Sequence, residues 1–87
     1  MAHGADSRSE VRRQLRLGTL LLKFAKSDGT ATTGTGSFRI VGVLEKQLAA
    51  IKRLDQEGSN LRPARRRLDR IMLRVAVQIE KNQRNHN

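Results

Sequence analysis

The chain has 87 residues, enough for one small domain over residues 1–87, and carries 18 lysines and arginines against eight acidic residues, a formal net charge of +10. It contains no cysteine, which excludes disulfides, thiol catalysis and cysteine-ligated zinc. No segment approaches the run of about 18 apolar residues needed to span a membrane, and Trp and Tyr anchors are missing, so no membrane binding is expected.

Charge is distributed unevenly along the chain. Residues 1–27 carry six basic and two acidic side chains, residues 28–60 carry four of each, and residues 61–87 carry eight and two. The pattern predicts a neutral packing element between two elements that face an anion.

The amino terminus has no basic region followed by an apolar run, so an intracellular location, cytoplasmic or nuclear, is expected.

A first helix is expected over about residues 8–27, with residues 1–6 frayed. Ser7 and Glu10 have the spacing of a capping box at its start. Gly18 weakens the helix interior and would permit the close approach of another backbone. One sector about 80° wide is basic and contains Arg8, Arg12, Arg16, Lys23 and Lys26. Apolar residues cover more than half of the circumference, so this helix needs more than one neighbour: Val11, Leu17, Leu20, Leu21, Leu22, Phe24 and Ala25.

Residues 29–36 are rich in Gly and Thr and are therefore expected to form a flexible linker. A nucleotide-binding loop is not expected there, because the segment lacks the Gly-Lys-Ser/Thr ending of such loops. A second helix is expected from residue 37 or 38 to about 57, where Gly58 ends it. Its polar face carries Arg39, Lys46, Lys52 and Arg53. Alternatively, residues 38–43 form a short strand, since Phe, Ile and Val favour strands. A ribbon-helix-helix type of DNA-binding protein would require that strand.

A third helix is expected to begin near Asn60 to Pro63 and to reach about Lys81, with residues 82–87 frayed. Proline is tolerated in a first helical turn because its missing N–H would have no partner there. One side of this helix is apolar, with Leu68, Ile71, Met72, Val75 and Ile79. Another side carries a line of cations, Arg67, Arg70, Arg74 and Lys81.

These cations predict binding to a polyanion, because the planar guanidinium stays charged and can hold a phosphate through two hydrogen bonds. Nucleic acid is the leading candidate, and duplex backbone recognition is favoured over base stacking because the chain has only two aromatic residues. RNA and DNA are not distinguished. The candidate phosphate contacts on the third helix are Arg62, Arg65, Arg66, Arg67, Arg70, Arg74 and Lys81. A second surface on the first helix contributes Arg12, Arg16 and Lys23.

The predicted fold is therefore all-α, a small three-helix domain that forms a homodimer. Leu73 and Val77 lie away from the main apolar stripe of the third helix. Either the first helix covers them, or they form the homodimer contact. An alternative function is a structural or adaptor protein whose basic and apolar helix faces bind an acidic protein partner.

The chain has no paired carboxylates, no Ser/His/Asp set and no metal-ligand spacing, so neither enzymatic activity nor a cofactor or metal is expected. His3 and His86 lie in terminal segments and are expected to be exposed.

Two partial resemblances concern the third helix. Gly58-Ser59-Asn60-Leu61 followed by Ala64-Arg65-Arg66-Arg67-Leu68 resembles the Gly-x-Asn-Leu…Ala-Arg-x-Leu stretch of plasmid mobilisation accessory proteins, without the usual glutamine and asparagines. The helix, turn and long basic helix are similar to the double-stranded RNA-binding silencing suppressors of nodaviruses. Each resemblance covers less than half of the chain, so no family is assigned and no residue role is transferred.

Overall fold

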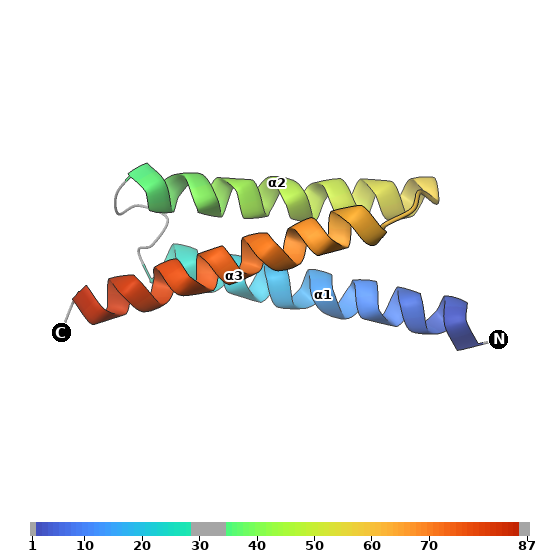
Figure 1. The fold of residues 1–87 in the computed structure, drawn as a ribbon, viewed down its shortest axis with the longest axis horizontal. Helices are drawn as coiled ribbons and strands as arrows, with labels where there is room; N and C mark the ends of the chain where they lie inside the picture. Colours follow the sequence, from blue (N-terminus) through green and yellow to red (C-terminus); the bar gives the residue numbers. More distant parts are fainter. Residues whose placement is uncertain (1, 29–34, 86–87) are drawn as a thin grey trace.

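The computed structural model describes the backbone of residues 2–28 and 35–85, and the side chains of residues 9–28 and 39–84. Three helices follow one another, α1 (Ala2–Ser27), α2 (Thr35–Glu57) and α3 (Arg62–Asn85). α1 and α3 run in the same direction, and α2 runs antiparallel to both (Figure 1). Within the described backbone there is no strand, which confirms the all-α prediction.

The alternative strand at residues 38–43 is wrong, because these residues belong to α2. Val41 is buried together with Leu44 and Leu48. The apolar spacing of three and four residues therefore continues through this segment, and it outweighs the strand preference of the individual residues. A ribbon-helix-helix arrangement is excluded with it.

Helix boundaries differ from the prediction at three places. α1 begins at Ala2, so the helix already runs through the expected capping box at Ser7. Thr35 and Gly36 belong to α2 rather than to the linker, whose residues 29–34 lie outside the described residues. α3 continues four residues past Lys81, where Arg84 pairs with Glu80 one turn earlier at 2.8 Å.

The turn between α2 and α3 confirms the expected helix stop at Gly58. Gly58 has φ 73°, a left-handed conformation that glycine adopts without steric cost. The Gly58 N–H donates to the Asp55 carbonyl at 3.2 Å, and the Ser59 N–H donates to the Leu54 carbonyl at 3.0 Å. This pair of bonds is the Schellman motif. The short connection makes α2 and α3 antiparallel neighbours.

Asn60 and Pro63 form the predicted start of α3. The Asn60 side-chain oxygen accepts a hydrogen bond from the Arg62 N–H at 3.2 Å, and the Arg65 N–H donates to the Leu61 carbonyl at 2.8 Å. Pro63 lies in the first turn, where a missing N–H has no energetic cost.

The core is aliphatic and lies along the axis of the bundle. Its buried members are Val11 and Ala25 of α1, Val41, Leu44, Leu48 and Ile51 of α2, and Leu68, Ile71, Val75 and Ile79 of α3. The last four confirm the predicted apolar stripe of α3. Burial of this stripe fixes the rotation of α3 and so directs its basic line outward.

Gly18 of α1 lies against Leu48 of α2. A Cβ added there would come within 2.6 Å of Leu48 Cδ2. The expected close approach is therefore present, but the neighbour is a leucine side chain and not another backbone.

Candidate nucleic-acid interface

The basic line on α3 is exposed and unneutralised. Arg67, Arg70, Arg74 and Lys81 are all exposed. The ion pairs among the described side chains are Lys26–Glu45, Arg65–Glu10 and Arg84–Glu80, and none of them involves these four residues. Their mutual repulsion is therefore not offset by an ion pair with any carboxylate among the described side chains.

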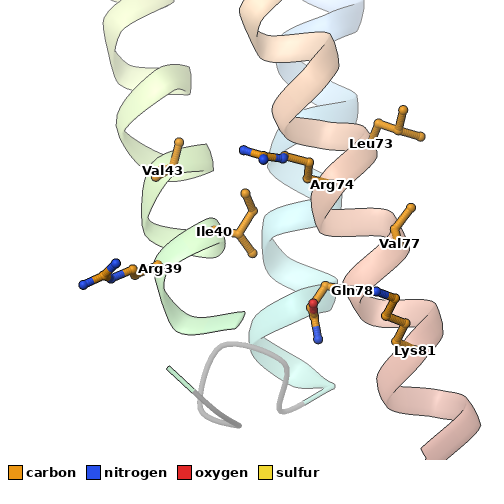
Figure 2. A pocket seen from close by; sticks show the side chains of 8 residues that line it. All are labelled: Arg39, Ile40, Val43, Leu73, Arg74, Val77, Gln78 and Lys81. Carbon is orange, nitrogen blue, oxygen red and sulfur yellow. The ribbon is translucent and has the colours of Figure 1, made fainter. Parts of the chain in front are cut away.

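Arg39 of α2 extends this basic line across a groove. Figure 2 shows Arg39 on one side of the groove and Arg74 and Lys81 on the other. Arg39, Lys46 and Arg53 are separated by seven residues each, so they lie along one side of α2, and all three are exposed. Within this row Arg39 lines the groove beside the α3 line, and we call the two rows together the α2–α3 face.

The contribution of α2 was missed because its total charge is balanced. Two of the three acidic residues of α2 point elsewhere: Glu45 binds Lys26 of α1 at 2.9 Å, and Asp55 lines a hollow beside Val11 of α1. The third, Glu57, lies one turn after Arg53 at the end of the basic side. The total charge of α2 is therefore balanced although its basic residues and most of its acidic residues lie on different sides of the helix. The seven-residue spacing of Arg39, Lys46 and Arg53 was the signal that could have revealed it.

The basic sector of α1 lies on a different face. Arg12, Arg16 and Lys23 are exposed, and Lys26 of the same sector binds Glu45 of α2. α2 therefore lies between this sector and the basic line of α3. The prediction treated this sector as a second basic surface, and in the structure it lies apart from the basic line of α3.

Arg65 differs from its neighbours because it has internal partners. Its Nε donates to Gln14 Oε1 at 2.9 Å, and its Nη2 lies 3.4 Å from Glu10 Oε2. Its side chain is only 29% exposed. Arg65 thus joins α3 to α1, whereas the exposed Arg62 and Arg66 line an open hollow of about 520 Å³ at the start of α3.

A groove of about 600 Å³ lies between the amino-terminal half of α2 and the carboxy-terminal half of α3. Ile40 and Val43 contribute apolar surface from α2. Leu73 and Val77 line the groove from α3, and Arg74 extends toward α2 (Figure 2). Leu73 is 66% exposed and Val77 is 42% exposed. The expectation that helix one covers these two residues is therefore wrong, because α1 packs on another side of α3.

Two negative findings apply to the described part of the chain. It contains no cluster of three or more His, Cys, Asp or Glu side chains placed to hold a metal ion. None of its helices combines the length and apolarity needed to cross a membrane.

Comparison with protein families, with curated proteins and with solved structures gave no match for this chain.

Proposed function

We propose that this protein is a non-enzymatic nucleic-acid-binding protein that binds a duplex through its phosphate backbone, largely independently of sequence. The observation that carries the proposal is the exposed line of Arg67, Arg70, Arg74 and Lys81, which has no carboxylate partner among the described residues. At a helical rise of 1.5 Å per residue, these charges recur every 5 to 10 Å or so. That interval is comparable to the spacing of phosphates along one strand.

The α2–α3 face supplies two rows of cations to such a ligand. Arg39, Lys46 and Arg53 form the α2 row. Binding through rows of phosphate contacts depends on charge and duplex shape and carries no base information. Phe24 is the one aromatic side chain in the described part of the chain, so successive bases have no stacking platform there.

The proposal also includes a homodimer that acts inside the cell. A chain of this size buries only roughly 60–65% of its unfolded surface as a monomer, and a partner copy adds core area. Apolar side chains at Leu17, Leu20, Phe24 and Leu73 remain about half exposed or more in the single chain.

The experiment that tests the proposal is a fluorescence anisotropy titration with duplex RNA, duplex DNA and single strands. The variant is Arg67→Ala/Arg70→Ala/Arg74→Ala. A matched control, Arg12→Ala/Arg16→Ala/Lys23→Ala, removes the same three charges from α1. The α3 variant should lose about a thousandfold in duplex affinity near 0.1 M salt, because each of the three phosphate contacts contributes roughly one factor of ten there. Equal losses in both variants would show that net charge, and not the α3 line, controls binding.

A second candidate is an acidic protein partner. The groove between α2 and α3 favours it, because Ile40 and Val43 present apolar surface beside the unpaired Arg39 and Arg74. An amphipathic segment with acidic flanks is complementary to such a groove. Partner capture that survives nuclease treatment and is abolished by Val43→Glu would support this candidate over nucleic acid.

A further inference from the structure

We infer that the groove between α2 and α3 binds an acidic amphipathic helix of a partner protein, and that this helix competes with a duplex for the same cations. Binding of the helix depends on the groove alone. The competition rests on the proposed function, because it requires that a duplex binds to the α2–α3 face.

The middle of the groove is apolar. Ile40 and Val43 line it from α2, and Leu73 and Val77 line it from α3 (Figure 2). Val43, Leu73 and Val77 are half of the six large apolar side chains that remain exposed among the described residues. Aliphatic side chains offer a phosphate neither a hydrogen bond nor a charge. The apolar floor is therefore the part of the α2–α3 face that binding to a phosphate backbone leaves unexplained.

The rim of the groove is cationic. Arg39 lies on the α2 side, and Arg74 and Lys81 lie on the α3 side (Figure 2). All three are exposed, and none takes part in an ion pair among the described side chains. Among the described residues, no acidic side chain lines the groove. The complementary ligand therefore carries negative charge on both sides of an apolar strip.

A helix suits this groove better than an extended segment does. The two walls are helices, whose backbone groups bond internally, so they offer no strand edge to which a partner could add. A helix satisfies its own backbone groups and buries one apolar side. The groove follows α3 over residues 73–81, about 12 Å at the helical rise. It therefore accommodates about two turns of the partner, with apolar side chains at the spacing i, i+3 or i+4, and i+7.

The partner is a chain different from this one. A second copy brings the same net charge of +10. Each of its three helices carries more basic than acidic side chains. Like charges that meet across an interface repel each other. An acidic segment of another protein is therefore the occupant that the rim selects.

The helix and the duplex need the same side chains. Arg39 belongs to the α2 row, and Arg74 and Lys81 are two of the four cations in the α3 line. A helix in the groove covers these three residues and places its own carboxylates beside Arg67 and Arg70. The carboxylates repel phosphates that approach the rest of the line. Binding of the partner therefore releases nucleic acid from the protein.

The test uses a fluorescein-labelled synthetic peptide of about 15 residues, a length at which an isolated helix begins to be stable in water. Its leucines at i, i+4 and i+7 form one side, and glutamates flank that side. A control peptide has the same composition in an order that forms no apolar side. Anisotropy should show that the protein binds the amphipathic peptide at least about tenfold more tightly than the control peptide.

Val43→Ala/Leu73→Ala truncates the floor of the groove and changes no charge. It should weaken binding of the amphipathic peptide about tenfold or more and leave duplex affinity unchanged. The matched control is Leu17→Ala/Leu20→Ala, which truncates two exposed side chains of α1 and should bind the peptide like the wild type. Alanine favours a helix, and circular dichroism checks that both variants keep theirs. Val43→Gln/Leu73→Gln replaces the first variant if it does not.

Unlabelled amphipathic peptide should also release a labelled duplex from the wild-type protein. Equal affinity for the two peptides would overturn the inference, because charge alone would then account for binding. Unchanged peptide affinity in the floor variant would overturn the assigned groove, and simultaneous binding of peptide and duplex would overturn the competition. Peptide binding without any duplex affinity would instead overturn the nucleic-acid proposal and leave the helix-binding groove in place.

Discussion

Gln14 is the buried polar residue of the described core, and its replacement by Met tests how α1 is attached to α3. Its amide group makes three hydrogen bonds to α3. Nε2 donates to Asp69 Oδ1 at 2.6 Å and to the Arg65 carbonyl at 3.1 Å, and Oε1 accepts from Arg65 Nε at 2.9 Å. Met keeps the length and unbranched shape of the side chain but removes all three bonds.

We expect Gln14→Met to lower the free energy of unfolding by about 2 kcal/mol. A hydrogen bond contributes about 0.5–1.5 kcal/mol net, and more when one partner is charged. Asp69 is exposed and the Arg65 side chain is 29% exposed, so water replaces part of what is lost. For a domain of this size, 2 kcal/mol corresponds to a decrease in Tm of roughly 8–16 °C.

The assay is thermal unfolding followed by far-UV circular dichroism, at one protein concentration because dimerisation would make Tm depend on it. Gln47→Met and Gln56→Met are graded controls. Gln47 makes one hydrogen bond to α3, to the Ala64 carbonyl at 3.1 Å, whereas Gln56 is exposed. The expected loss is largest for Gln14, about 1 kcal/mol for Gln47 and near zero for Gln56. Equal Tm values for the Gln14 and Gln56 variants would refute the assigned role of Gln14.

Two further pairs of variants separate packing from surface charge. Gly18→Ala should lower the free energy of unfolding by about 1 kcal/mol, although alanine has a better helix propensity than glycine, because the new Cβ meets Leu48 Cδ2 at 2.6 Å. Gly42→Ala, with nothing within 4 Å of its Cβ, should stabilise by up to about 1 kcal/mol, and the opposite order in thermal unfolding would contradict the packing described. Arg65→Ala should lower Tm more than duplex affinity, and Arg67→Ala should do the reverse, since only Arg65 has partners in α1. Anisotropy and unfolding measured on both variants check this, and equal behaviour of the two would count against it.

Periodicity predicted the parts of the fold that depend on local sequence. The stripe of Leu68, Ile71 and Val75 identified the buried side of α3, and Gly58 identified the end of α2. Both follow from short-range rules, namely which residues share a helix side and which residue tolerates positive φ. The strand alternative failed because the apolar spacing around Val41 suits a helix.

The neighbours of each helix could not be predicted in the same way. A helical wheel orders residues around one axis, but it does not say which helix lies on which side. The wheel therefore did not show that the basic sector of α1 and the basic line of α3 lie apart, or that Arg39 of α2 lies across a groove from Arg74. Arg65 acquired its structural role from Glu10 and Gln14, which are more than 50 residues away in the chain. Pairings at that distance depend on how the three helices associate.

The salt dependence of duplex binding tests the central claim most directly. For duplex DNA, the slope of log affinity against log salt concentration changes by about 0.9 for each phosphate contact. Loss of Arg67, Arg70 and Arg74 should therefore reduce the magnitude of the slope by about 2.7. The Arg12→Ala/Arg16→Ala/Lys23→Ala control should keep a slope close to that of the wild type. An unchanged slope in the α3 variant would contradict phosphate binding by α3.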